Sequence, residues 1–489
     1  MRLPTHRSPA PGAARDRSSS LGPHRRRRRW VWALGAAAAA LCGFAARAQQ
    51  KPDDAAPEPA RPASAPATAP GAPADDAIER AIGDAESAGA AAAGQAPPEE
   101  SGAELHSVPA AAANAVAQTA PLPGLSLLRK ARPGAGGAYF APTTDGKTAR
   151  LTLHPELQAQ MQKLLSTYKP QGASLVAVDP KTGKVLALVE YASDSKADGM
   201  AVKPLYPAAS VFKIITGAAL LEKGVSPDAE TCYHGGMHGL VNKLLQDKPR
   251  LDRRCLSLSM ALAKSANVVF AKMAVKHLDA GSLRAQAEKF LFNRPIWADP
   301  SVDPSTAQIP DSGLEFAKSA AGFGNVKLSP LHAALIAAAV GNGGVAPNPT
   351  LIESIDGDPP EPSGSRRILR PETAKALTEM MKLTVSQGTA THSFKERRRM
   401  VLGDIEVAGK TGSLSSHQRP FKDFSWFVGF APANDPQIAI AAVVVNGLKW
   451  KIHAPYVARE ALRVYLMGGQ LGQPPAARVK RHRRSPRRR

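Results

Sequence analysis

The sequence predicts an α+β fold in which strands from both ends of one domain share an antiparallel sheet that helices flank. Strand patterns occur early in the domain, over residues 173–190, and again late, over residues 405–445. Helical patterns dominate between them, from about 208 to 290 and from 314 to 342. Terminal strands with helices between them are typical of α+β domains, so we also expect a mostly helical subdomain in the middle.

The charge of the chain is concentrated at its two ends. The 489 residues carry a formal net charge of +22, of which residues 1–48 contribute +9 and residues 470–489 contribute +8. Residues 49–125 contribute −8, which leaves +13 for residues 126–469. The basic balance therefore does not predict a nucleic-acid-binding domain, and no nucleic-acid partner is expected.

Residues 1–48 have the pattern of an export signal. The basic block Arg25–Arg29 precedes seventeen uncharged residues and a small-x-small sequence that ends at Ala48. Such a segment is either cleaved by signal peptidase or retained as a membrane anchor, and both interpretations stay open. In either case we expect the rest of the chain on the outer side of a bacterial cytoplasmic membrane, periplasmic or at the membrane's outer face.

Residues 49–138 are expected to form a disordered tether. Residues 49–125 contain twelve Pro and no aromatic residue, so they cannot bury enough apolar surface to offset the entropy of ordering. One folded domain is expected over residues 139–469. The basic tail, 470–489, is expected to be disordered, either simply solvated or in contact with anionic lipid or wall polymer.

A helix and a hairpin open the folded domain. Pro155 suits a first helical position, and a helical run continues from it to Tyr168. The apolar residues of this run share one face: Leu157, Met161, Leu164 and Leu165. Two strands then surround the turn Asp179-Pro-Lys-Thr-Gly183. The strands that close the domain are expected at Ile405–Gly409, Ser425–Ala431 and Ile438–Val445.

Cysteine usage fits export. Cys42 lies in the signal segment, which leaves Cys232 and Cys255 as an even pair. In an oxidising compartment a disulfide between them is the favoured interpretation. Free thiols are one alternative, and metal ligation together with His234 and His238 is another. Because this spacing matches no standard zinc module, no metal is predicted.

The first chemical motif places a serine and a lysine three residues apart where a helical segment begins. It reads Ser210-Val-Phe-Lys213 and leads into an apolar run. A serine in the first turn lies near the positive end of the helix dipole, and the lysine lies on the same face one turn later. If burial or a nearby cation keeps the lysine neutral, it can act as a base for the hydroxyl. Taken alone, the pattern is more often a helix cap beside a surface lysine.

The second motif, Ser265-Ala-Asn267, follows the helical segment Leu258–Lys264. A hydroxyl and an amide placed so close together can pass a proton and hold a substrate amide. A capping serine beside a turn asparagine is the ordinary alternative.

The third motif, Lys410-Thr411-Gly412-Ser413, directly follows the expected strand Ile405–Gly409. The lysine and threonine can bind a carboxylate, the glycine lets a substrate backbone approach, and a backbone N–H beyond it can face an oxyanion. The same Lys-Thr-Gly sequence at 181–183 lies in the predicted hairpin turn, and we interpret that copy as structural.

In this order and spacing the motifs match those of penicillin-binding proteins and β-lactamases. The chain resembles the transpeptidase domain of penicillin-binding proteins over residues 145–468. Further segments that carry the resemblance are Leu151–Gln158, Val178–Ala187, Gly322–Gly324, Leu328–Leu331, Gly341–Gly344, Gln387–Ala390 and Trp426–Pro432. The resemblance implies a β-lactamase/transpeptidase-like α+β fold.

The resemblance also implies catalytic roles. Ser210 is expected to be the acylated nucleophile and Lys213 the base that activates it. Ser265 is expected to relay the proton to the leaving amine. Lys410 is expected to supply positive potential that helps keep Lys213 neutral.

Substrate-binding roles follow from the same resemblance. Asn267 is expected to hydrogen-bond the substrate amide, and Thr411 to bind the terminal carboxylate. The backbone N–H groups of Ser210 and Ser413 are expected to form the oxyanion hole. Gly412 is expected to let the substrate backbone approach the strand closely.

The implied activity is that of a penicillin-binding peptidoglycan D,D-transpeptidase that forms an acyl-serine on D-Ala-D-Ala stem peptides without a cofactor. The alternatives are a D,D-carboxypeptidase, a β-lactamase and a non-catalytic sensor of β-lactam or wall. No Glu-x-x-x-Asn pattern follows Ser265 to position the water that a β-lactamase needs. Because residues 49–138 cannot hold a glycan-polymerising domain, a separate polymerase is an expected partner, besides stem peptides and β-lactams.

Overall fold

The structure is a computed structural model that describes residues 124–194, 198–296, 302–361, 364–416, 419–469 and 471. The predicted signal or anchor, the tether before residue 124 and nearly all of the basic tail lie outside these residues. Within the described ranges, no helix has the length and apolar character needed to cross a membrane.

Regular structure begins before the predicted boundary at residue 139. Helix α2 (Gly124–Lys130) buries Leu127 in the core, because three leucines close together supply the apolar face that the preceding residues lack. Strands β1 (Arg132–Pro133), β2 (Tyr139–Pro142) and β3 (Thr148–Leu151) follow, with the 3-10 turn η1 (Ala135–Gly137) between the first two. They form a sheet with the distant strand β12 (Ile352–Ile355). The folded part therefore includes residues that the sequence analysis assigned to the tether.

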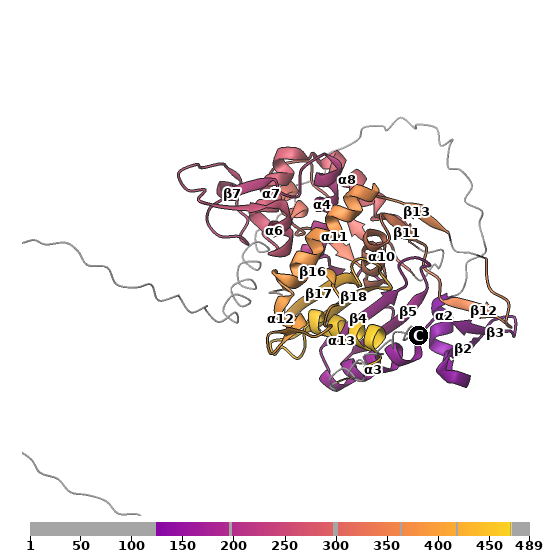
Figure 1. The fold of residues 1–489 in the computed structure, drawn as a ribbon. Coiled ribbons are helices and arrows are strands. Elements are labelled where there is room, and N and C mark those ends of the chain that lie inside the picture. The colour runs from indigo at the N-terminus through magenta and orange to yellow at the C-terminus, as the bar shows by residue number, and fades with distance from the viewer. Residues whose placement is uncertain are drawn as a thin grey trace, which may run out of the picture. The chain divides into compact units, whose positions relative to one another are not determined.

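A five-stranded antiparallel sheet joins the two ends of the domain, as the α+β prediction requires. Its order is β16-β17-β18-β4-β5, and the purple β4 and β5 lie beside the orange-to-yellow β18 and β17 in Figure 1. The strands are β4 (Gly172–Val178), β5 (Val185–Ala192), β16 (Ala408–Ser416), β17 (Lys422–Ala431) and β18 (Ile438–Asn446). The turn between β4 and β5 contains Lys181-Thr182-Gly183, and the Asp179 carboxylate accepts from two of its backbone N–H groups. The earlier Lys-Thr-Gly sequence is thus a hairpin turn, as predicted.

Alternating side chains of the sheet divide the interior into two cores. On β18, Ile440 and Val444 belong to the core beneath helices α3 (Pro155–Tyr168) and α13 (Ala454–Met467). Ala441 and Val443 belong to the core beneath α10 (Pro330–Gly341) on the other face. This two-residue period is what a strand buried on both faces requires. Helix α3 begins with Pro155 at its first turn and buries its four predicted apolar residues.

Helices from the middle of the chain form the rest of the domain and carry most of the motifs. They are α4 (Lys213–Glu222), which the 3-10 turn η2 (Ala209–Phe212) precedes, α5 (Asn242–Leu245), α6 (Leu258–Ala263), α7 (Asn267–His277), α8 (Ala280–Lys289), α9 (Gly313–Ala320), α11 (Pro371–Ser386) and α12 (Thr391–Phe394). A hairpin of β7 (Glu230–Tyr233) and β8 (Arg254–Ser257) interrupts the stretch predicted as helical from 208 to 290.

Short strand pairs connect these helices to the sheet. Strand β10 (Val326–Leu328) pairs with β6 (Tyr206–Pro207) and β9 (Thr306–Ala307). The other pairs are β11 (Val345–Pro347) with β13 (Ser365–Arg367), and β14 (Lys395–Glu396) with β15 (Arg399–Met400).

One predicted strand differs from the structure in a way that matters for the site. The sequence analysis placed a strand at Ile405–Gly409 and the third motif after it, but β16 starts only at Ala408 and includes the whole motif. Lys410 pairs with Val428 and Ser413 with Ser425 in regular antiparallel register. The turn-like composition of Lys-Thr-Gly-Ser concealed a strand that the neighbouring β17 stabilises.

Candidate active site

The three motifs converge where η2, the α6–α7 junction and β16 meet. Ser210 lies on η2, Lys213 opens α4, Asn267 opens α7, and Lys410 lies on β16. All four side chains are buried, and both lysines have no measurable exposure to solvent. Polar groups so deeply buried need partners, and the structure provides them.

Lys213 links the first two motifs. Its Nζ lies 2.8 Å from Ser210 Oγ, 2.6 Å from Asn267 Oδ1 and 2.6 Å from the backbone oxygen of Ala321. Ser210 lies in a 3-10 turn rather than in the first turn of an α-helix, which corrects the sequence-based expectation. The contact still forms because residues three apart eclipse one another in a 3-10 turn.

Lys410 links the second and third motifs. Its Nζ donates to Ser265 Oγ at 3.0 Å and to the backbone oxygen of Thr411 at 2.7 Å. Ser265 has a φ of +54°, a left-handed conformation that is rare for residues other than glycine and is found at functional sites. Hydrogen bonds thus join Ser210, Lys213 and Asn267 in one set, and Ser265 and Lys410 in a second.

Asn267 is oriented from both sides. Its Oδ1 accepts from Lys213, while its Nδ2 donates to the backbone oxygen of His238 at 2.8 Å. The next residue, Val268, donates its backbone N–H to the oxygen of Met237 at 3.1 Å. The first turn of α7 is therefore held by the loop between β7 and β8.

Strand β16 forms an edge of the five-stranded sheet and passes close to η2. In the described part of the chain β17 is its one strand partner, so the opposite edge is available for an extended peptide. A Cβ added to Gly412 would lie 3.2 Å from Val211 Cγ2. The Thr411 hydroxyl hydrogen-bonds to that of Thr389, and the side chain of Ser413 is half-buried. The absence of a side chain at Gly412 therefore allows the edge strand to approach the turn that carries Ser210.

Gly322 packs closely against the turn that carries Ser210. It has a φ of +96°, and a Cβ there would lie 2.0 Å from the backbone oxygen of Ala209. Ala209 itself has a φ of +47°. A side chain at Gly322 would displace the residue next to Ser210, so only glycine fits this position.

His238 and Thr389 are site residues to which the sequence analysis gave no catalytic or substrate-binding role. Burial, with the charges of Lys213 and Lys410, lowers the pKa of His238 to about 4, although a hydrogen bond to the Ser265 backbone opposes this. The ring is therefore neutral at physiological pH. The glycines around His238 signalled a loop, but a loop that returns to the site cannot be recognised from local sequence.

The loop that carries His238 is closed by a disulfide. Cys232 and Cys255 face each other across β7 and β8 and are bonded, so their thiols are not metal ligands. Lys272 of α7 donates to the backbone oxygen of Cys232 at 2.8 Å and pairs with Asp252 at 3.2 Å. The disulfide-closed loop is thus attached to the helix that Asn267 opens.

Comparison with known proteins agrees with this arrangement. The pattern of the penicillin binding protein transpeptidase domain matches residues 173–462. The peptidoglycan D,D-transpeptidase PbpA of Mycolicibacterium smegmatis is 29% identical over an alignment of 319 residues that covers 57% of this chain and 62% of that protein. The Mycobacterium tuberculosis protein of the same name is 28% identical over 348 residues, 62% of this chain and 68% of the relative.

Solved structures show the same fold. Penicillin-binding protein A from M. tuberculosis, determined as an acyl-enzyme complex, has 26% identity and a TM-score of 0.54, and covers 66% of this chain and 80% of its own. The family pattern includes the central sheet and all three motifs that meet around Lys213 and Lys410. The chain therefore belongs to the family of penicillin-binding protein transpeptidase domains.

Proposed function

We propose that this chain is a peptidoglycan D,D-transpeptidase that acts through an acyl-serine intermediate. The observation that carries the proposal is the buried Lys213 amine, 2.8 Å from Ser210 Oγ. This is the distance at which a base can take a proton from a nucleophilic hydroxyl. Relatives named peptidoglycan D,D-transpeptidase, and a similar protein determined as an acyl-enzyme, support the proposal.

Acylation begins when Ser210 Oγ attacks the carbonyl carbon of the penultimate D-Ala. Lys213 must lose its own proton before it takes the hydroxyl proton, and both burial and the nearby Lys410 favour that loss. The backbone N–H groups of Ser210 and Ser413 stabilise the oxyanion. When the C–N bond breaks, Ser265 passes a proton to the departing amine of the last D-Ala. The enzyme then holds the rest of the stem peptide as a serine ester.

Substrate binding uses the edge of β16 and the Asn267 amide. An extended stem peptide pairs with β16 as an added strand, and Gly412 leaves room for it next to η2. Asn267 hydrogen-bonds the substrate amide. The Thr411 hydroxyl and the Lys410 charge bind the terminal carboxylate. Penicillins enter as analogues of the same acyl donor.

The acyl acceptor is the amine of a second stem peptide, which gives a cross-link, and transfer to water would instead give a carboxypeptidase. The chain would act outside the cytoplasmic membrane, where stem peptides are, with a separate protein polymerising the glycan. No residue of the site is needed to hold a metal or cofactor for this reaction.

Incubation with pentapeptide-bearing muropeptides tests the proposal. Mass analysis is expected to detect cross-linked dimers and released D-Ala, with neither product formed by Ser210→Ala. Trimmed monomers without dimers would replace the transpeptidase by a carboxypeptidase. Unchanged substrate under conditions in which the protein is folded would refute both enzymatic functions.

Penicillin turnover separates the proposal from a β-lactamase. One equivalent of a chromogenic β-lactam is expected to be consumed in a burst, followed by little further hydrolysis, because no Glu-x-x-x-Asn pattern follows Ser265 to position a deacylating water. Sustained hydrolysis over many turnovers would assign the site to a β-lactamase instead.

A further inference from the structure

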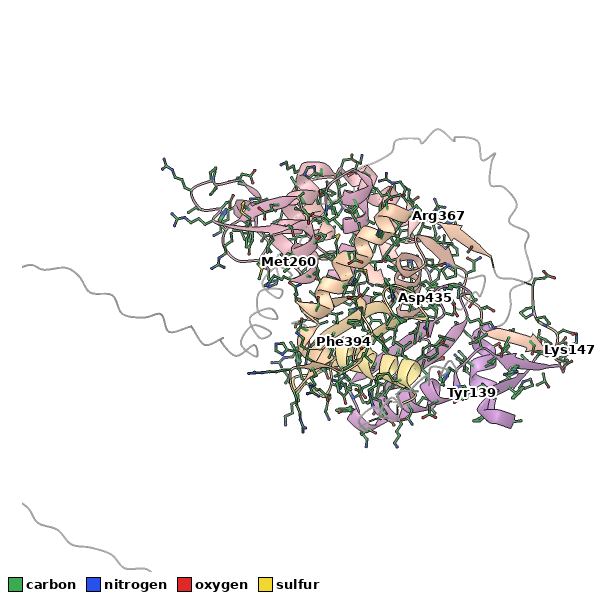
Figure 2. All side chains as sticks on the ribbon, in the orientation of Figure 1. Tyr139, Lys147, Met260, Arg367, Phe394 and Asp435 are labelled. Carbon is green, nitrogen blue, oxygen red and sulfur yellow. A yellow bond between two sulfur atoms is a disulfide. The ribbon has the colours of Figure 1, made fainter. Side chains whose placement is uncertain are left out.

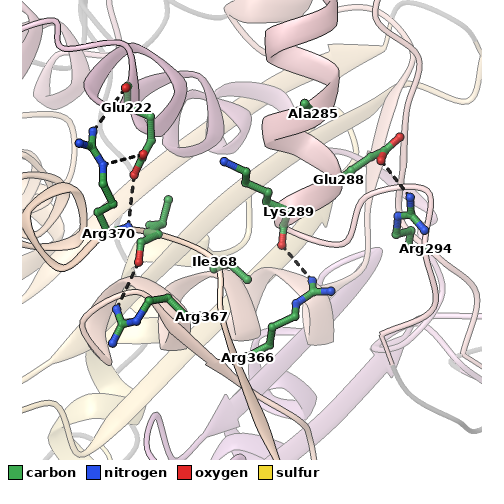
Figure 3. A pocket seen from close by; sticks show the side chains of 10 residues that line it. Glu222, Ala285, Glu288, Lys289, Arg294, Arg366, Arg367, Ile368 and Arg370 are labelled. Carbon is green, nitrogen blue, oxygen red and sulfur yellow. Dashed lines mark hydrogen bonds and ion pairs between the residues drawn. The ribbon is translucent and has the colours of Figure 1, made fainter. Parts of the chain in front are cut away.

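A cavity of about 550 Å³ with basic walls lies at the C-terminal end of α4 and the N-terminal end of α11 (Figure 3). We call it the arginine pocket. Its residues come from the end of α4, from α8 and the turn after it, and from β13 and the segment leading into α11: Glu222, Ala285, Glu288, Lys289, Arg294, Arg366, Arg367, Ile368, Leu369 and Arg370. Its volume lies within the usual range for small-ligand sites.

The pocket has an excess of positive charge. Five cationic side chains and two carboxylates line it, which leaves a net charge of +3. Arg370 Nε pairs with Glu222 at 2.8 Å, and Arg294 pairs with Glu288 at 3.0 Å. In the described part of the chain these pairs use both carboxylates of the pocket.

The other three cations of the pocket have no carboxylate partner among the described residues. Arg366 and Arg367 bond instead to backbone oxygens, Arg366 to that of Lys289 at 3.1 Å and Arg367 to that of Gly343 at 2.8 Å. These contacts hold the guanidinium groups in place without neutralising them. In Figure 3 the Lys289 side chain extends into the space between Glu222 and Ala285.

The backbone of the pocket is preorganised. Strand β13 pairs with β11, and the N–H groups of Ile368 and Leu369 both donate to the oxygen of Gly344. Gly344 has a φ of +89°, and a Cβ there would lie 2.5 Å from the oxygen of Leu369. Arginines on such a fixed segment lose little entropy when they bind a ligand.

Glu222 shows that the pocket stabilises a negatively charged oxygen. Its carboxylate accepts from the backbone N–H and the Nε of Arg370, at the start of α11. Burial alone would raise the pKa of Glu222, but hydrogen bonds from Thr373 and Arg370 bring it below its ordinary value. The pocket therefore already favours one oxyanion, and three cations remain for another.

The arginine pocket and the active site lie at opposite ends of α4 and of α11. Lys213 opens α4 at the active site and Glu222 closes the helix at the pocket. Helix α11 starts after Arg370 at the pocket, and Thr389, beyond its other end, contacts Thr411. In Figure 2, Arg367 and Phe394, which flank α11 in sequence, lie well apart. No motif residue lines the pocket, so it is a separate site.

We propose that the arginine pocket binds a multivalent phosphate-type oxyanion through Lys289, Arg366 and Arg367. Guanidinium groups bind phosphate oxygens in bidentate geometry, and three cations provide enough positive charge to balance a pyrophosphate or a phosphate monoester. The phosphate is either a free ion or the headgroup of a lipid, and the experiment below distinguishes the two. This site goes beyond the proposed transpeptidase reaction and is independent of it.

Calorimetric titration of the full chain with pyrophosphate tests the proposal, with sodium chloride of matched ionic strength as the reference. We expect saturable one-site binding and a rise in the melting temperature. Arg366→Gln/Arg367→Gln is expected to weaken binding at least about tenfold, because both guanidinium contacts to the anion are lost. Lys289→Gln provides a second variant that removes no hydrogen bond of β13.

Arg397→Gln/Arg398→Gln is the matched control, because it removes the same charge from the exposed β14–β15 turn. It is expected to leave the affinity unchanged. Covalent β-lactam labelling at the wild-type rate would show that the pocket variants are folded. Equal weakening by both double variants, or no saturable binding to the wild-type chain, would overturn the proposal.

Vesicles identify the source of the phosphate. Binding to phosphatidylcholine vesicles that contain phosphatidic acid, whose headgroup is a phosphate monoester, would support a lipid headgroup if it competes with pyrophosphate and is lost in Arg366→Gln/Arg367→Gln. Binding of pyrophosphate without vesicle binding would support a free ion.

Discussion

At the scale of single residues, the site consists of buried polar groups that hold one another. Lys213 donates to Ser210 and Asn267, Lys410 donates to Ser265, and the backbone of His238 accepts from Asn267. Removing one member leaves a buried donor or acceptor without a partner, which costs more than the bond itself contributed. Substitutions in this set should therefore affect both stability and acylation.

His238 should make the stability of the protein depend on pH. Its pKa is about 4 in the native state because of burial and the two lysines, against an ordinary value near 6.5. Between these pH values the unfolded chain binds more protons, so the free energy of unfolding should fall by up to about 3 kcal/mol as the pH drops from 6.5 to 4.

Urea unfolding of the wild type and of His238→Gln at a series of pH values measures this. The variant should lose part of the pH dependence. The rest should remain, because burial also lowers the pKa of His332 to about 4. Identical pH profiles for the two proteins would contradict the proposed environment of His238.

Gly322 should be needed for acylation because of its contact with the serine turn. In Gly322→Ala the new Cβ would meet the oxygen of Ala209 at 2.0 Å, and the displaced turn should slow β-lactam labelling on the order of 100-fold. Gly324→Ala is the matched control, since Gly324 also has a positive φ but its nearest neighbour is a side-chain oxygen at 3.2 Å. If the two variants label at equal rates, the contact with Ala209 is not what positions Ser210.

At the scale of elements, local patterns predicted what lies within one element and missed what depends on a distant one. Helix α3 and the β4–β5 hairpin were predictable because Pro155 and the Asp179–Gly183 turn carry local signals. Strand β16 was placed too early, because its residues favour turns and it is β17 that makes them a strand. The β7–β8 hairpin was missed because its pairing joins residues that lie more than twenty positions apart.

The site residues that could be predicted from sequence divide from the others in the same way. The eight motif residues were predicted from sequence because the spacing within each motif is local and the order of the motifs is specific to a family. His238 was missed as a part of the site because a loop closed by a disulfide brings it back over α7. Thr389 was missed because its contact with Thr411 forms across two elements.

Reduction of the Cys232–Cys255 disulfide should weaken the hold on Asn267. The bond closes a loop with a sequence separation of 23, so its loss should lower the free energy of unfolding by about 3 kcal/mol. Asn267 and Val268 would then lose their hydrogen bonds to the backbone oxygens of His238 and Met237. This loss should also slow covalent labelling of the protein by a β-lactam.

Labelling rates with and without dithiothreitol, for the wild type and for Cys232→Ser/Cys255→Ser, measure the effect. The reductant should slow the wild type and leave the variant, already slow, unchanged. Wild-type rates in the reduced protein would show that the loop holds its place without the disulfide.

At the scale of the whole molecule, one domain contains the sheet, the helices and the site. Its last helix, α13, carries a buried cluster of charged side chains. The buried Glu460 carboxylate pairs with Arg459 and with Arg463, both at 2.7 Å, while Arg459 also reaches the backbone oxygen of Ser393 near α12. Helix α13 packs on β17, β18 and α3. The charged cluster thus links α13 to α12.

Glu460→Gln should destabilise the protein by about 3 to 5 kcal/mol, because it removes the buried carboxylate charge that pairs with two buried guanidinium groups. Glu396→Gln removes an exposed carboxylate that pairs with the same Arg459, and should cost less than about 1 kcal/mol. Denaturant unfolding measures the free energy of unfolding of both variants. Similar losses in the two would mean that burial does not decide how much these ion pairs contribute to stability.

The proposed function of the whole molecule depends on acylation of Ser210. Incubation with benzylpenicillin, proteolysis and mass analysis measure it directly. We expect one penicilloyl adduct per chain on the peptide that contains Ser210, no adduct in Ser210→Ala, and labelling slowed on the order of 1000-fold in Lys213→Met. An adduct that persists in Ser210→Ala, or no adduct on the folded wild-type protein, would contradict it.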